Sequence, residues 1–248
     1  FHVHGANGWH ARIPAYATRV VQDDESKNYT AQFWIDEPFD WSEDNFSASK
    51  CSPLLIYETH IGMAQEKEGV GTYTEFRDEV LPRITAAGYN AVQLMAIAEH
   101  PYYGSFGYHV SNFFAPSSRF GTPEELKSLI DKAHEMGIAV IMDLVHSHAV
   151  KNEVEGLGNL AGDPCQYFYQ GDRREHPAWD SLPSGFIPVN FSNSTAWKRL
   201  SASALAVRFP PICTPVILSL QWARAPTETT LRNIIYRGLS ARLPTLIR

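Results

Sequence analysis

Residues 139–148 read Ala-Val-Ile-Met-Asp-Leu-Val-His-Ser-His, and no other ten residues of the chain constrain its fold as closely. The first seven are almost all apolar, which is typical of a strand buried on both faces of a parallel sheet. Asp143 interrupts this run, and a buried charge is costly unless it is paired. His146 and His148 follow the run directly. Because α/β barrels place their chemistry at the carboxyl ends of parallel strands, the stretch predicts both a barrel strand and part of a site.

The residues before this strand alternate between strand and helix patterns. Short apolar runs at 54–57 and 90–95 predict two earlier strands. The segment 96–121 is rich in Gly, Tyr, Phe and His, and it predicts a long loop after the second strand. With a helix between each pair of strands, the order is β-α-β-α-β, which predicts an α/β fold with a parallel sheet.

The two helices are marked by their ends as well as by their periodicity. Residues 72–75 and 122–125 are capping-box sequences, in which a Thr side chain and a Glu three residues later satisfy each other's backbone N–H groups. Apolar residues at helical spacing follow both boxes, and Gly88 and Gly137 supply the C-terminal ends. Pro82 predicts a local irregularity within the first helix.

The composition is that of a globular protein, with 44% hydrophobic and 12% aromatic residues. Cys51, Cys165 and Cys213 lie far apart and form no CxxC motif, which predicts reduced, intracellular thiols. No apolar run reaches about 18 residues, so we expect no membrane span. The chain begins at Phe1 with neither a Met nor a signal-peptide pattern, and we expect that its true start lies further upstream.

The charge balance changes sharply near Ser181. From Leu182 onward there are eight Lys or Arg residues and one acid, Glu228, whereas residues 1–181 carry 13 basic and 26 acidic residues. The strand–helix alternation also stops there. We therefore predict that residues 182–248 are a separate, irregular tail.

Five motifs in the first 181 residues carry a family resemblance. They are Ile56-Tyr-Glu-Thr-His-Ile-Gly62, Gln93-Leu-Met-Ala-Ile-Ala-Glu-His100, Ser105-Phe-Gly-Tyr-His109, Ala115-Pro-Ser-Ser-Arg-Phe-Gly-Thr-Pro123 and Asp143-Leu-Val-His-Ser-His148. Together they resemble the 1,4-α-glucan branching enzymes, which are glycosyltransferases of the α-amylase clan of glycoside hydrolases. The resemblance implies that residues 46–181 begin a (β/α)8 TIM barrel with its first three βα units. It also implies that residues 1–45 end a β-sandwich carbohydrate-binding module.

The resemblance implies a reaction and three substrate-binding residues. The family cleaves an α-1,4-glucan (glycogen, amylose or amylopectin) and transfers the freed segment to a 6-hydroxyl, with retention, through two carboxyl groups. In this chain, Tyr108 would stack on the glucose at the cleavage site, and His148 would form a hydrogen bond with the same sugar. Asp143 would pair with an arginine two residues before the nucleophile. The implied compartment is the cytoplasm, or the plastid in a plant or alga.

The catalytic carboxyl groups of the family have no counterpart in the 248 residues. The family's nucleophile follows the fourth barrel strand and its acid/base Glu follows the fifth, but no Asp occurs after Asp180, and Glu228 lies in a dissimilar context. A barrel of this kind typically needs about 250 residues, and only 103 follow Val145. We therefore expect no catalytic residue and no activity in this chain. We hypothesise that residues 182–248 are a frameshifted or mis-spliced reading of the gene.

Other candidate residues admit simpler interpretations. Glu99 and His109 are possible substrate contacts, although shaping the loop is the simpler role. Trp9 and Arg12 could contact glucan from the β-module, although a structural role is again simpler. His146 and His148 lack a third and fourth ligand at suitable spacing, so we expect no metal, and the sequence implies no other cofactor. The basic tail lacks Lys and Arg clusters, so we expect no nucleic-acid partner.

Two alternative functions remain open from the sequence. The first is a hydrolase of the same clan, which would give no α-1,6 linkages. The second is a non-catalytic glucan-binding fragment, although an incomplete barrel with unpaired edges at its first and third strands would favour aggregation.

Overall fold

The computed structural model describes residues 1–5, 7–35, 38–42, 46–145, 147–160, 162, 167–169, 171–176, 180–183 and 205–207. His146, Cys165, Cys213 and most of the predicted tail lie outside the described residues.

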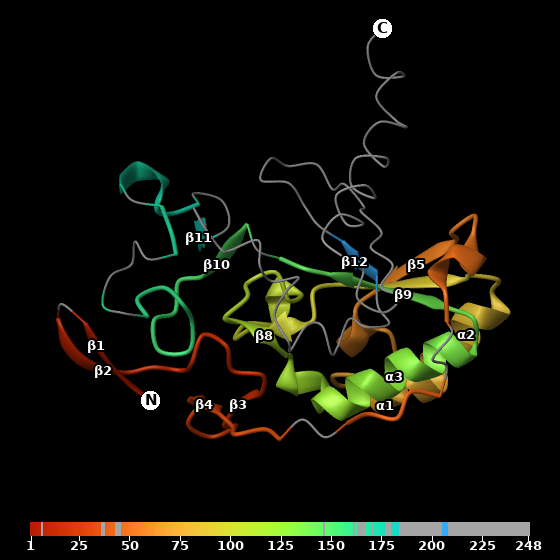
Figure 1. Ribbon diagram of the computed structural model, residues 1–248, viewed down its shortest axis with the longest axis horizontal. Coiled ribbons are helices and arrows are strands. Elements are labelled where there is room, and N and C mark those ends of the chain that lie inside the picture. Colours follow the sequence, from red (N-terminus) through yellow and green to blue (C-terminus); the bar gives the residue numbers. More distant parts are fainter. Residues whose placement is uncertain are drawn as a thin grey trace, which may run out of the picture.

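A four-stranded parallel sheet forms the centre of the described structure (Figure 1). Its strands are β5 (Ile56–Thr59), β6 (Ala91–Leu94), β9 (Ala139–Asp143) and β12 (Leu205–Val207), in the order β12-β9-β6-β5. Every neighbouring pair is parallel. The prediction of a parallel sheet from three β-strands is therefore confirmed, and the first strand begins two residues later than its apolar pattern predicts.

Strand β12 corrects two predictions. It lies in the tail that was predicted to be irregular, and its residues pair in register with Ile141–Asp143 of β9. Strand β9 is therefore not an edge strand, because it has a neighbour on each side. The sequence pattern misses β12 because Leu-Ala-Val is too short to show a period, and its pairing with β9 joins residues that are far apart in the chain.

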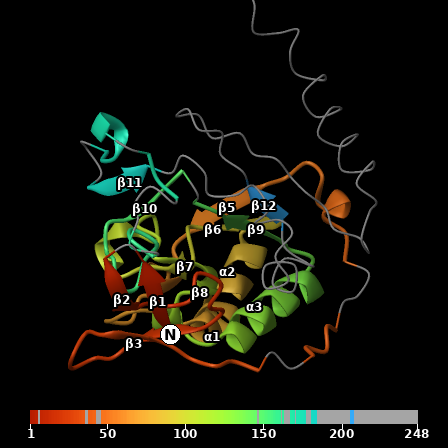
Figure 2. The same ribbon diagram turned by 60° about the vertical axis from the view of Figure 1, so that its left-hand side comes forward.

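The helices α1 (Tyr73–Glu75), α2 (Leu81–Ala86) and α3 (Pro123–Glu135) cover one face of this sheet, as both views show (Figures 1 and 2). A π-helical turn, η3 (Phe76–Val80), joins α1 to α2. It lies just before Pro82, which has no N–H to continue the regular helical hydrogen bonds, so the predicted irregularity is confirmed.

Both predicted capping boxes are present. Thr122 accepts a hydrogen bond from the Glu125 N–H, and the Glu125 carboxylate accepts one from the Thr122 N–H, so α3 begins at the expected residue. Thr72 and Glu75 form the same reciprocal pair at α1. Gly88 and Gly137 have φ values of 86° and 75°, as expected of glycines that end helices.

The sheet separates two apolar layers. On the helix side, Val92, Leu94, Val140 and Met142 belong to the main core, which also contains the buried residues of α2, α3 and η3. On the other face, Ala91, Ala139 and Ile141 pack with Cys51 in a smaller cluster. Successive residues of a strand point to opposite faces, which accounts for this division.

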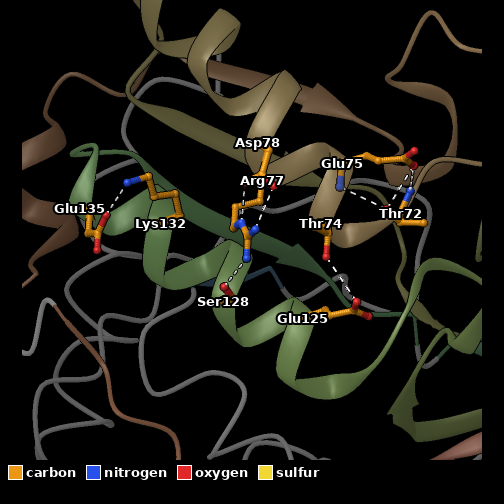
Figure 3. Close-up of polar contacts among 9 residues, drawn as sticks. All are labelled: Thr72, Thr74, Glu75, Arg77, Asp78, Glu125, Ser128, Lys132 and Glu135. Carbon is orange, nitrogen blue, oxygen red and sulfur yellow. Dashed lines mark hydrogen bonds and ion pairs between the residues drawn. The ribbon is translucent and has the colours of Figure 1, made fainter.

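Polar contacts join the helices to each other on the outside (Figure 3). The Thr74 hydroxyl donates to Glu125 at 3.3 Å, and the Arg77 guanidinium donates to the Ser128 hydroxyl at 2.8 Å. These side chains link α1 and η3 to α3, so that the two βα units pack as one layer.

The segment 96–121 is not simply a loop, which corrects the prediction. It contains an antiparallel pair, β7 (Ala98–Glu99) and β8 (Asn112–Pro116), with the 3₁₀ turns η4 (Tyr103–Ser105) and η5 (Ser118–Phe120). Every residue of β8 is buried. The surrounding glycines and prolines conceal this strand in the sequence.

The remaining elements are short. Residues 1–31 form two hairpins, β1 (His2–Gly5) with β2 (Gly8–Ala11) and β3 (Val20–Gln22) with β4 (Tyr29–Ala31), which confirms their predicted β character. β10 (His148–Val150) pairs with β11 (Ser181–Pro183). Single 3₁₀ turns occur at η1 (Ala48–Cys51), η2 (Ile61–Met63) and η7 (Gly171–Arg173). None of the helices in the described part is long and apolar enough to cross a membrane.

Residues of the N-terminal segment form hydrogen bonds with α3 and with a residue just before it. The Trp34 indole donates to Glu124 at 3.0 Å, and Ser42 donates through its N–H and hydroxyl to Asp131, each at 2.9 Å. Arg19 donates to the Gly121 carbonyl just before the helix. The first 42 residues therefore pack against the barrel part through polar contacts.

The capping box of α3 provides a test of this architecture. Replacing Thr122 by Ala removes the side-chain acceptor for the Glu125 N–H, so the free energy of unfolding should fall by about 1 kcal/mol. Thr122→Ser keeps the hydroxyl and should recover most of that loss. Urea denaturation of the three proteins measures the effect, and a Thr122→Ala variant as stable as the wild type would contradict it.

Candidate functional site

Asp143 occupies the last position of β9 and is a buried polar residue of the sheet. Its side chain is 3% exposed. The Tyr108 hydroxyl donates a hydrogen bond of 2.8 Å to its Oδ2 atom. Its Oδ1 atom has no hydrogen-bond partner among the described residues. The predicted pairing of Asp143 with an arginine is therefore not seen in the part of the chain that the structure describes.

The surroundings of Asp143 disfavour its charged form. Burial raises the pKa of this carboxyl, the hydrogen bond from Tyr108 opposes the shift, and the negative charge of Glu58 adds to it. Burial also raises the pKa of Tyr108 well above its usual value, and the charges of Asp143 and Glu58 add to that shift. Tyr108 therefore stays protonated at neutral pH and acts as a hydrogen-bond donor.

His148 lies beside this pair, because it forms a hydrogen bond with the Tyr108 backbone, and His109 lies against His148. Their rings meet edge to face with centroids 6.4 Å apart, and the Ser147 hydroxyl lies 2.9 Å from the His148 Nδ1. Burial lowers the pKa of His148, so its imidazole is neutral at neutral pH. A neutral imidazole can donate one hydrogen bond and accept another, which suits it to a sugar hydroxyl.

A tight turn places Tyr108 against Asp143. Phe106 and Gly107 both have positive φ values, of 53° and 89°. A Cβ atom at Gly107 would lie 1.7 Å from the Ala96 carbonyl oxygen, so only glycine fits here. The ring of His60 meets Phe106 edge to face at 5.7 Å, which packs the turn against the residue that follows β5.

Glu99 is directed into the loop rather than toward Asp143. Its carboxylate accepts hydrogen bonds from the Ser118 N–H at 2.6 Å and the His100 N–H at 3.2 Å. Burial raises its pKa, while these hydrogen bonds oppose the shift. This geometry supports the loop-shaping interpretation of Glu99.

Trp9 and Arg12 lie apart from Tyr108 and Asp143. Trp9 is 70% exposed on β2, a strand that lies well away from β9 (Figure 1). Arg12 donates to the carbonyl oxygens of Asn159 and Ala11, at 3.1 and 2.9 Å. The structure therefore does not bring these two residues together with the other predicted site residues.

Two residues near the site are missing from the predicted set. Glu58 of β5 and Gln93 of β6 lie opposite each other, and the Gln93 amide donates to the Glu58 carboxylate at 3.2 Å. The period of two along each strand could have revealed them, because it places them on the same face as Asp143.

The described residues contain no group of three or more His, Cys, Asp or Glu side chains that could hold a metal ion. His146, which formed part of the only metal hypothesis, lies outside the described residues.

A family profile covers the central part of the chain. The profile described as alpha amylase, catalytic domain, matches residues 67–199, which is more than half of the chain. The chain belongs to the alpha-amylase family. The match includes β6, β9 and the segment that carries Tyr108, Asp143 and His148.

The curated relatives are 1,4-alpha-glucan-branching enzymes. That of Dictyostelium discoideum is 51% identical over 177 residues, which are 71% of this chain and 26% of the relative. That of Yarrowia lipolytica is 51% identical over 181 residues, with the same two shares. The chloroplastic/amyloplastic enzyme 2-2 of Arabidopsis thaliana is 63% identical over 128 residues, or 52% of the chain and 16% of the relative. The motif resemblance is confirmed, and the chain spans about a quarter or less of these relatives.

A solved structure supports the fold. A crystal structure described as an alpha amylase from Salmonella typhimurium matches with a TM-score of 0.55 and 23% identity, over 72% of this chain and 28% of that one. This member of the alpha-amylase family therefore has a TIM-barrel-like α/β fold. Tyr108 and Asp143 lie at the carboxyl end of β9, where such folds carry their sites.

The steric requirement for glycine in the turn before Tyr108 can be tested by replacing Gly107 and a control glycine, Gly69, by alanine. Gly69 also has a positive φ, of 107°, but a Cβ there would have nothing within 4 Å. Gly69→Ala should cost only the backbone strain, about 1–2 kcal/mol. Gly107→Ala should cost about 1–3 kcal/mol more, because its neighbours must move. Urea denaturation compares the two variants, and equal losses would contradict the steric argument.

The protonation of Asp143 gives a pH-dependent test. The pKa of Asp143 is raised in the folded state, so the folded chain keeps the proton to a higher pH than the unfolded chain does. In the unfolded chain the pKa of Asp is about 3.9. The stability due to the neutral carboxyl is therefore present at low pH and is lost as pH rises through the raised pKa. Asp143→Asn, which never ionises, should gain stability relative to the wild type as the pH rises above about 4 and through the raised pKa.

Thermal unfolding of both proteins across this pH range measures the difference. A gap between wild type and Asp143→Asn that does not change with pH would contradict the assignment. A gap that changes in the opposite direction would indicate a cationic partner for Asp143.

Proposed function

We propose that this chain carries the first part of the catalytic barrel of a 1,4-α-glucan branching enzyme, and that its site binds an α-1,4-glucan. The observation that carries the proposal is the Tyr108–Asp143 hydrogen bond at the carboxyl end of a parallel strand, with His148 bonded to the Tyr108 backbone. Its context supports it, because curated relatives with 51–63% identity to this chain are named 1,4-alpha-glucan-branching enzymes.

Each side chain has a role that its chemistry supports. The half-buried Tyr108 ring offers a stacking surface for a sugar while its hydroxyl orients Asp143. Neutral His148 forms a hydrogen bond with a sugar hydroxyl. Asp143 accepts hydrogen bonds and helps to hold the site in place.

The bond cleavage itself needs two further carboxyl groups. A retaining transfer uses one carboxylate as nucleophile and a second carboxyl as acid and then base. The 248 residues contain no motif resembling either group after β9. We infer that these 248 residues alone bind glucan and orient it but do not cleave it.

The proposal extends to the two ends of the chain. Residues 1–45 are the end of a carbohydrate-binding β-module, which their two hairpins and the exposed Trp9 support. Residues 182–248 arise from a frameshift or mis-splicing, which their reversed charge balance supports. Reading the transcript across codons 178–186 tests this, and an intact frame with tail peptides seen by mass spectrometry would refute it.

A chimera tests the proposed function. Residues 1–181 replace the matching segment of the Dictyostelium discoideum relative, and the product formed from amylose is followed by the iodine spectrum and by analysis for α-1,6 linkages. The chimera should branch amylose, whereas the 248-residue chain alone should leave the iodine spectrum unchanged. Shorter linear products without α-1,6 linkages would instead support a hydrolase.

The site residues are tested in the same chimera. His148→Ala should lower the branching rate by about 10²-fold, the usual scale for losing one hydrogen-bonding group at a transition state. His2→Ala is the matched control, because His2 is an exposed histidine on β1. A folded His148→Ala chimera with the control's activity would refute the role of this site.

A further inference from the structure

The face of the sheet opposite the helices changes from apolar to polar along its strands. On this face β5 carries Ile56 and then Glu58, and β6 carries Ala91 and then Gln93. On β9 the face ends with Asp143. Because side chains alternate along a strand, the polar members lie toward the carboxyl ends of three neighbouring strands and on one side of the sheet.

Glu58 and Gln93 form a preformed pair within this polar part. They are direct partners in the β5–β6 register, and the Gln93 amide donates to the Glu58 Oε1 atom at 3.2 Å. Glu58 is exposed and Gln93 is partly exposed. The amide therefore fixes the direction of a carboxylate that a ligand can still reach.

The charge of Glu58 reaches the described site. It contributes to the raised pKa values of both Asp143 and Tyr108, so the three groups share one electrostatic environment. Asp143 has its Oδ1 atom unpartnered among the described residues although the side chain is almost fully buried. An unsatisfied buried acceptor is costly, and a donor from a ligand would remove that cost.

We propose that Glu58, oriented by Gln93, is a glucan-binding residue that forms with Asp143 a pair of acceptors for sugar hydroxyls. This inference rests on the proposed function and adds two residues to its site. An α-1,4-glucan supplies neighbouring hydroxyl donors on each ring, and hydroxyl-to-carboxylate hydrogen bonds are among the stronger ones in proteins. Tyr108 adds an aromatic ring beside the same acceptors, which favours a sugar over a simple cation.

The test is a calorimetric titration of the 248-residue chain with maltoheptaose. Glu58→Gln keeps the shape of the side chain and the contact with Gln93 but removes the charge. It should weaken maltoheptaose binding about tenfold, as expected for one charge-assisted hydrogen bond. Gln93→Ala should weaken it to a smaller degree by releasing Glu58. Glu68→Gln, an exposed glutamate outside the sheet, should bind like the wild type.

The outcomes separate this inference from the proposed function. Weaker binding in His148→Ala together with unchanged binding in Glu58→Gln overturns the inference and leaves the proposed function standing. Absence of maltoheptaose binding by the wild-type chain also overturns the inference, while branching by the chimera decides the proposed function independently. Titration with MgCl₂ provides the alternative, because binding of Mg²⁺ without maltoheptaose would assign the two carboxylates to a cation.

Discussion

The hydrogen bond from Tyr108 to Asp143 is the interaction on which this structure depends. A carboxyl group in a strand buried on both sides requires a donor, because burial without one is costly. The strand itself cannot supply that donor, so the chain between β6 and β9 supplies it from 35 residues away. Tyr108 lies between the paired strands β7 and β8 and directly follows the turn at Phe106 and Gly107. His60 packs against that turn.

The same requirement gives the two faces of the sheet different roles. On β6 and β9 the face toward α2 and α3 is apolar, and its residues belong to the same core as the buried residues of those helices. The opposite face is apolar toward the amino ends of the strands, at Ala91, Ala139 and Ile141. Toward their carboxyl ends it carries polar groups. The small apolar cluster packs between these strands. The register of the strands sets the spacing of Glu58, Gln93 and Asp143.

The parts that the sequence predicts well are those set by local chemistry. The capping boxes at Thr72 and Thr122 depend on residues three positions apart, so their helices begin where the pattern indicates. The pairs that the sequence does not reveal are not local. Glu58 and Gln93 are 35 residues apart and become neighbours only through the register of β5 and β6. β12 is likewise defined by its pairing with β9 rather than by its own three residues.

A buried carboxyl with a raised pKa beside a second carboxylate is the pattern expected of a catalytic acid and its partner. Here the geometry argues for a different role. Asp143 is 3% exposed, and Tyr108 donates to one of its oxygens, so this carboxyl is held in place as a hydrogen-bond acceptor. Glu58, the second carboxylate, is exposed and accepts a hydrogen bond from the Gln93 amide, which orients it as an acceptor. Under the proposed function both groups are therefore acceptors that position a sugar, and the carboxyl groups that cleave the glucan are others.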